Sequence, residues 1–373
     1  MSKRLLNLDT LRGLAALLVV WQHSSEVFIQ IPNIALHGTD LANFISQLDF
    51  GRIGVLCFFL LSGYVIPHSL LEANRPLKCF AIRRFFRLYP TYWVSLIIAV
   101  SFTWLFTGHI FSPVAILANT TMLQGLLGFE NVQKLYWTLT AELIFYLLCA
   151  MMFALKLLGN PKNLLLLCWA TLSLFICLQL FEHSPALQLQ LPVTITYIPY
   201  GIAVMFCGAL LRYCFETKRF HRYAVLAIAS TFSIPILVLS LHLFGNSISS
   251  EPVRFGLSHL IALGIFLSVI SLPLNSIRHF ATLGTISYSI YLFHLCMIYV
   301  MKWSISQPWG QAFSGFPLSV YLSVTTLASI ALATLIYWLI ERPFVKLGRS
   351  LSTSAQDAES AQQQESEKVA IRT

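Results

Sequence analysis

Ten apolar runs, each about 18 to 22 residues long and so about the length a helix needs to cross a bilayer, recur along this chain. Of its 373 residues, 57% are apolar and only 10% are charged, against the ~25% charged residues of ordinary soluble domains. The sequence therefore predicts an all-α, polytopic integral membrane protein with about ten transmembrane helices. The runs are Leu8–Ile29, Ile53–Leu71, Pro90–Phe106, Leu135–Leu157, Leu164–Phe181, Val193–Tyr213, Tyr223–Phe244, Phe255–Leu272, Phe280–Met301 and Leu318–Ile340.

Lysine and arginine are distributed unevenly between the two sides that ten spans define. The positive-inside rule places these residues in short cytoplasmic loops. With the N-terminus inside, seventeen of the 24 Lys and Arg residues fall on the cytoplasmic side and only four fall outside. We therefore expect both termini in the cytoplasm, with residues 1–349 forming the transmembrane domain. Residues 350–373 are polar and poor in aromatic residues, which predicts a disordered cytoplasmic tail.

The overall composition argues against several other classes of protein. The net charge is +9, but the basic residues are scattered between apolar runs, so no contiguous patch for nucleic acid is expected. The eight cysteines fall mostly inside apolar runs without a Cys-x-x-Cys pair, so we expect neither a disulfide framework nor a metal site. Asp9 and Arg12 interrupt the first run, which is therefore expected to be a retained helix and not a signal peptide.

Asp9, Arg12 and His23 are ionisable residues within the first run. Such residues are costly within a membrane helix unless they face the bundle interior or a watery cavity. Arg12 and His23 are eleven residues apart, so they point the same way at about 16 Å along the helix axis. A functional pair is one reading, and an Asp9–Arg12 ion pair at the interface with a packing role for His23 is the other.

Further polar residues are expected in the outer half of the membrane, near the depth of His23. Glu142 lies about two turns below the outer end of the fourth run, where a carboxylate needs a partner. Ser287, Tyr291 and His294 fall on one face of the ninth run. We expect these groups to converge with His23. For His294, hydrogen bonding between helices and a part in catalysis both stay open.

A cationic layer is expected near the cytoplasmic side. The segment KCFAIRRFFRLYP contains Arg83, Arg84 and Arg87, and ERPF at the end of the tenth run contains Glu341 and Arg342. Membrane topology alone predicts basic residues at these helix ends. Arginine forks also bind phosphate oxygens through two hydrogen bonds, where lysine offers a point charge. Coenzyme A carries such phosphates.

These motifs together resemble the membrane acyltransferase 3 family over residues 5–347. The matching pieces, in order, are LDTLRGLAALLVVWQH, GVLCFFLLSGYVI, RRFFRLYP, WTLTAE, SYSIYLFH and ERPF. The resemblance implies a standalone membrane acyltransferase domain without a fused SGNH-type domain. It also implies the cell inner membrane as the location, and action either alone or with a separate extracytoplasmic transferase partner.

Residue roles follow from the resemblance. It implies that His23 is the catalytic residue with Arg12 as its companion, that Arg84 and Arg87 engage the acyl donor with Arg83 beside them, and that Glu142 is a further catalytic candidate. No cofactor is expected to be bound. The implied reaction moves an acyl group, with acetyl expected, from acyl-CoA to a hydroxyl of a carbohydrate such as a surface polysaccharide, an exopolysaccharide or a lipopolysaccharide O-antigen.

The chemistry of histidine agrees with this assignment. A hydroxyl is a poor nucleophile until its proton is removed, and imidazole has a suitable basicity near neutral pH. We expect His23 to be a general base oriented by Glu142 or Tyr291, with an acyl-histidine relay as the alternative. Ser62 lacks a Gly-x-Ser-x-Gly elbow, so a packing role is expected for it. The rival functions are a secondary transporter, which does not account for the inner arginines, and a polysaccharide export partner.

Overall fold

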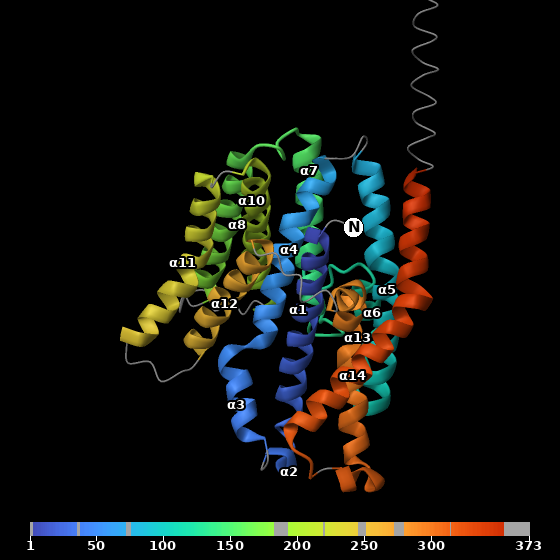
Figure 1. The fold of residues 1–373 in the computed structure, drawn as a ribbon. Helices are drawn as coiled ribbons and strands as arrows, with labels where there is room; N and C mark the ends of the chain where they lie inside the picture. The colour runs from blue at the N-terminus through green and yellow to red at the C-terminus, as the bar shows by residue number, and fades with distance from the viewer. Residues whose placement is uncertain are drawn as a thin grey trace, which may run out of the picture.

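Helices follow one another through the described chain, which contains no strand (Figure 1). The structure is a computed structural model, and it describes residues 3–35, 38–71, 76–182, 193–218, 221–244, 251–271, 280–313 and 315–353. The bilayer core offers no water to hydrogen-bond the backbone. An all-helical architecture meets this constraint, because each helix satisfies its own N–H and C=O groups.

In chain order the helices are α1 (Lys3–Phe28), α2 (Pro32–Ala35), α3 (Thr39–Leu48), α4 (Phe50–Leu71), α5 (Pro76–Thr107), α6 (Pro113–Asn119), α7 (Tyr136–Ala154), α8 (Pro161–Glu182), α9 (Val193–Thr196), α10 (Ile198–Thr217), α11 (Arg222–Phe244), α12 (Glu251–Ser271), α13 (Ala281–Ser306), η2 (Pro308–Phe313), α14 (Leu318–Ile336) and η3 (Tyr337–Glu341). Residues 342–353 continue as a helix directly after η3.

Eight of the described helices are long and apolar enough, by length and composition, to cross a membrane. Each of the eight overlaps one of the predicted runs, which confirms the polytopic membrane architecture. The other two predicted runs correspond to α1 and α11, which are both helical. The total of ten spans stays a prediction.

The largest differences from the predicted boundaries are at α5 and at the end of the last helix. Helix α5 begins at Pro76 and contains Pro90 in its interior, so the predicted start of this helix at Pro90 is wrong. Proline is tolerated inside membrane helices when neighbouring groups satisfy the freed backbone. At the other end of the chain, helix continues to residue 353, past the predicted start of the tail. Residues 354–373, the rest of the predicted tail, lie outside the described residues.

Helix α1 lies at the centre of the bundle, against α13 on one side and α4 on the other (Figure 1). Glycines allow these backbones to approach closely. A Cβ atom on Gly284 of α13 would lie 1.9 Å from the Asp9 carbonyl oxygen of α1. A Cβ atom on Gly63 of α4 would lie 1.7 Å from the Met205 carbonyl oxygen of α10. The positions of the central helices are therefore fixed by backbone contact.

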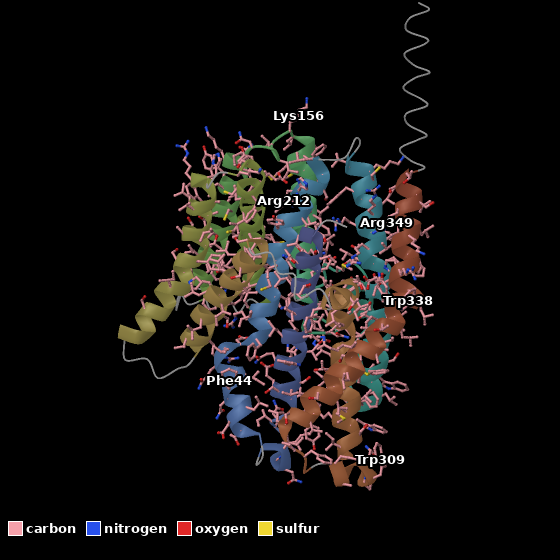
Figure 2. All side chains as sticks on the ribbon, viewed as in Figure 1. Phe44, Lys156, Arg212, Trp309, Trp338 and Arg349 are labelled. Carbon is pink, nitrogen blue, oxygen red and sulfur yellow. The ribbon has the colours of Figure 1, made fainter. Side chains whose placement is uncertain are left out.

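Basic side chains gather at one end of the bundle. Figure 2 shows Lys156, Arg212 and Arg349 toward the end that is uppermost in the view, and Trp309 at the opposite end. We call the first of these the basic end. All three belong to the set that the positive-inside rule predicts to be cytoplasmic, so the basic end is the predicted cytoplasmic end.

Substituting alanine at Gly63 tests the close approach of α4 and α10. We expect Gly63→Ala to lower the free energy of unfolding by about 2 kcal/mol or more, because the added methyl group displaces a buried backbone. Thermal unfolding of the purified protein in detergent measures the change. Gly264→Ala is the matched control, since a Cβ atom there meets nothing within 4 Å. An equal effect of the two substitutions would contradict this packing.

Candidate functional site

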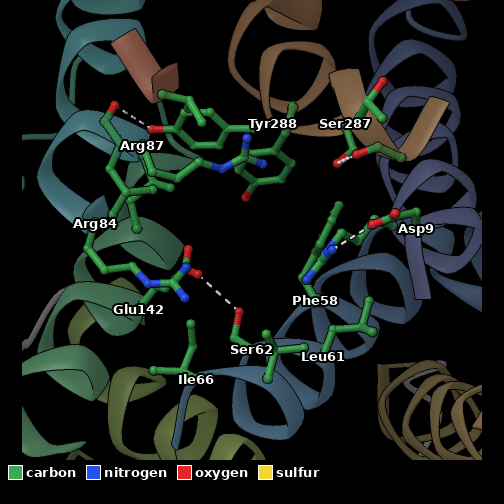
Figure 3. Close-up of a pocket in the computed structure, with 18 of the residues that line it drawn as sticks. Asp9, Phe58, Leu61, Ser62, Ile66, Arg84, Arg87, Glu142, Ser287 and Tyr288 are labelled. Atoms are coloured by element: carbon green, nitrogen blue, oxygen red, sulfur yellow. Dashed lines mark hydrogen bonds and ion pairs between the residues drawn. The ribbon is translucent and has the colours of Figure 1, made fainter. Parts of the chain in front are cut away.

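A cavity of about 770 Å³ opens between the central helices near the basic end (Figure 3). Its walls come from α1, α4, α5, α7, α13, η3 and residues 342–349. The elements that build it are far apart in the chain, so the cavity exists only in the assembled bundle. Its volume is within the range of sites for small molecules and cofactors.

Positive charge dominates the lining of the cavity. The cationic side chains of the lining are Arg12, Arg83, Arg84, Arg87, Arg342, Lys346 and Arg349. Within the described lining, the carboxylates are Asp9 and Glu142. Such an excess of cations inside a cleft with low-dielectric walls concentrates anions. The cavity is therefore a candidate site for an anionic ligand.

Arg84 and Arg87 reach the cavity from the same face of α5, because they are three residues apart in a helix. The guanidinium of Arg84 lies over the rings of Phe80 and Tyr146, at 5.4 and 5.3 Å from the ring centroids. Arg87 Nη1 donates to Glu341 Oε1 at 2.6 Å. Arg84 is therefore held by aromatic rings and Arg87 by a carboxylate.

Glu341 is a fully buried carboxylate to which the sequence alone assigned no role. It also accepts from Ser289 Oγ at 2.6 Å. It ends the π-helical turn Tyr337–Glu341, a rare distortion that often occurs at functional sites. The π turn shifts the phase of the helix, so the helical periodicity of the sequence could not predict the direction in which the Glu341 side chain points. The available signal was an acidic residue directly after an apolar run, which requires a buried partner.

The other arginines of the predicted set have distinct partners. Arg12 Nη1 donates to Asp9 Oδ1 at 2.8 Å, so the predicted alternative of an Asp9–Arg12 ion pair is present, and both residues also line the cavity. Arg83 Nε donates to Ser352 Oγ at 2.7 Å. Arg83 therefore also ties residues 342–353 to the first turns of α5.

Glu142 lies in the cavity and not beside His23. Its Oε1 accepts from Ser62 Oγ at 3.0 Å (Figure 3). It also accepts from the hydroxyl of Tyr146 at 2.5 Å. The packing role expected for Ser62 falls instead on its neighbour Gly63, and the Ser62 hydroxyl lines the cavity.

His23 is paired with His294. His23 Nδ1 lies 2.9 Å from His294 Nε2, and the two rings stack with centroids 5.2 Å apart. His294 is fully buried, and its Nδ1 lies 2.8 Å from the carbonyl oxygen of Tyr291. Because a carbonyl only accepts, we assign the His294 proton to Nδ1, which makes its Nε2 the acceptor for the His23 Nδ1–H. His23 Nε2 then keeps its lone pair.

The histidine pair lies just beyond one end of the cavity. His23 does not line the cavity, but Tyr291 does, and its ring centroid is 6.1 Å from that of His294. The hydroxyl of Tyr291 is 2.8 Å from Thr138 Oγ1, and its ring meets Phe58 at 5.8 Å. The expected meeting of His23 with the Tyr291–His294 face is therefore present. In the described part of the chain, no three His, Cys, Asp or Glu side chains cluster as a metal site would need.

Known proteins are similar to this chain over most of its length. Residues 5–338 match the family model described as an acyltransferase domain. The chain is 24% identical to Nodulation protein 10 of Rhizobium leguminosarum bv. viciae, with 92% of this chain and 94% of that protein covered. It is 29% identical to peptidoglycan O-acetyltransferase OatA of Listeria monocytogenes serovar 1/2a, with 78% of this chain and 49% of that protein covered. No solved structure matches the chain.

Removing the carboxylate of Glu341 tests its part in holding Arg87. We expect Glu341→Ala to lower the free energy of unfolding by about 3 kcal/mol, because the Arg87 cation loses its buried counter-charge. Denaturation of the purified protein in mixed micelles measures the loss. Glu216→Ala is the control, since Glu216 is 39% exposed in its ion pair with Arg212, and we expect a change of about 0.5 kcal/mol or less there. Similar losses in both variants would show that the Arg87–Glu341 pair stabilises the fold no more than an exposed ion pair does.

Proposed function

The chain belongs to the acyltransferase family whose domain it matches over residues 5–338, and from that premise we propose that it acetylates a carbohydrate hydroxyl with acetyl-CoA as donor. The observation that carries this proposal is the cationic cavity that ends beside the His23–His294 pair. The name of the relative OatA, a peptidoglycan O-acetyltransferase, supports acetyl as the group and a glycan as the acceptor.

The cavity suits the phosphates of an acyl-CoA. Arginine forks bind phosphate oxygens through paired hydrogen bonds, and the guanidinium of Arg84 lies over aromatic rings. Glu341 holds Arg87, so the remaining N–H groups of the Arg87 guanidinium point in a defined direction. We assign the diphosphate of the donor to Arg84 and Arg87, with Arg83 beside them.

The distance along α1 from the cavity to the histidine pair suits the arm of the donor. About a dozen bonds join the diphosphate of coenzyme A to its sulfur, which at the bond lengths of an extended chain reach roughly 15 Å. Arg12 and His23 are about 16 Å apart along α1. A thioester at the Tyr291 end of the cavity therefore lies next to the pair, and transfer requires the rings of Phe58 and Tyr291 to move apart.

His23 is proposed as the general base. Its Nε2 lone pair accepts the proton of the acceptor hydroxyl as the hydroxyl oxygen attacks the thioester carbonyl. The His23 Nδ1–H donates to His294 throughout, so the neighbouring ring orients the base and stabilises the imidazolium that forms. The carbon–sulfur bond then breaks, and the leaving thiolate takes the proton from His23. No covalent enzyme intermediate is required.

Orientation in the membrane follows from the same chemistry. Acyl-CoA is made in the cytoplasm, and the cavity is lined at the basic end by residues such as Lys346 and Arg349. The positive-inside rule assigns that end to the cytoplasm. We therefore propose a multi-pass protein of the cell inner membrane that takes its donor from inside, with the acceptor approaching His23 from the opposite side.

Mass spectrometry of surface glycans from a deletion strain tests the proposal. Wild-type protein should restore the acetyl mass increment, and His23→Ala should reduce it by about 100-fold or more, because a positioned base contributes that much to rate. His294→Ala should reduce it about tenfold, since the base stays but loses its orienting partner. His109→Ala is the control, because His109 is 52% exposed and lies away from the cavity.

Two outcomes would contradict the assignment. Wild-type acetylation by His23→Ala, at equal protein level in the membrane, would remove His23 from the chemistry. Loss of the whole polymer in the deletion strain, in place of polymer that lacks acetyl groups, would indicate an export partner.

A further inference from the structure

We propose that Arg342, Lys346 and Arg349 form a second phosphate subsite, separate from Arg84 and Arg87, that binds the 3′-phosphate of coenzyme A. This inference rests on the proposed donor. It assigns a specificity determinant to the helix that follows the π turn, and it distinguishes coenzyme A from carriers that share only the pantetheine arm.

The three cations lie on one face of their helix. Residues 342–353 are helical, and Arg342, Lys346 and Arg349 are separated by four and three residues, so they fall within about 60° of one another around the axis. All three line the cavity. Figure 2 shows Arg349 closer to the basic end than Trp338, so this face extends toward the basic end.

This group differs from Arg12 and Arg87 of the lining, each of which has a carboxylate partner. Arg12 is paired with Asp9, and Arg87 is paired with Glu341. Among the described residues, no carboxylate lies within ion-pair distance of Arg342, Lys346 or Arg349. The guanidinium of Arg342 lies over the ring of Trp338, 4.0 Å from its centroid.

Three like charges on adjacent turns of one helix repel one another. An anion between them would convert this repulsion into charge-assisted hydrogen bonds. Topology explains why basic residues lie near this end, but it does not explain why these three share the cavity face. Lys156 and Lys162 lie in the same predicted cytoplasmic set and do not line the cavity.

The chemistry of the donor explains the need for two groups of cations. Coenzyme A carries a diphosphate and, on the ribose, a separate phosphomonoester. A phosphomonoester has a charge of about −1.5 to −2 at neutral pH, so it requires more than one cation. The arginines of α5 suit the diphosphate, and the cations of residues 342–349, which come from a different wall, suit the phosphomonoester.

Calorimetric titration of the purified full-length protein in detergent tests the subsite, with coenzyme A and 3′-dephospho-coenzyme A as the two probes. We expect wild type to bind coenzyme A about tenfold more tightly than the dephospho form, as the loss of one exposed charge-assisted contact predicts. In the double variant Lys346→Ala/Arg349→Ala, affinity for coenzyme A should fall about tenfold, and affinity for the dephospho form should stay near the wild-type value. Lys162→Ala is the control and should leave both affinities unchanged.

Different failures have different meanings. If neither probe binds wild type, the proposed donor is wrong. If both probes bind wild type equally, or if the double variant keeps the tenfold preference, the donor stands and the subsite is wrong. An unchanged thermal unfolding midpoint in the double variant excludes misfolding as the cause of a loss, and we expect no change in the midpoint because Lys346 and Arg349 are exposed.

Discussion

The buried ion pair between Arg87 and Glu341 is the interaction on which the site depends. A carboxylate with no solvent exposure is stable in an apolar bundle only when its charge and both oxygens are satisfied. In this bundle Arg87 of α5 satisfies one oxygen and Ser289 of α13 satisfies the other. The π turn that presents Glu341 thereby joins three helices, fixes a guanidinium at the cavity wall, and sets the direction of the helix that carries Lys346 and Arg349.

Two helices connect the cavity to the histidine pair. Helix α1 carries Arg12 at the cavity and His23 beyond it, and α13 carries Ser287 and Tyr291 at the cavity and His294 beyond it. Because Gly284 allows α13 to contact the backbone of α1 at Asp9, the relative height of the two helices is fixed near the cavity. The number of residues between this contact and the histidine then sets the position of the histidine along each helix axis, so that His23 meets His294.

Much of this could be predicted from the sequence, and the failures have physical causes. Apolar length located the helices, and the eleven-residue spacing gave the shared face of Arg12 and His23. Glu142 lies about two turns from the outer end of its predicted run, near the depth of His23, and on that basis it was expected beside His23. In the structure Glu142 bonds Ser62 and Tyr146 in the cavity. Tertiary packing decides such pairings, and periodicity cannot detect a π turn.

We propose that donor binding and proton transfer are carried out by separate groups, the cavity cations and the His23–His294 pair. The most direct test is to measure coenzyme A binding and acetyl transfer in the same preparation of His23→Ala. We predict coenzyme A affinity within about twofold of wild type together with loss of transfer, since His23 does not line the cavity. Loss of coenzyme A binding in that variant, with folding intact, would contradict the division of roles.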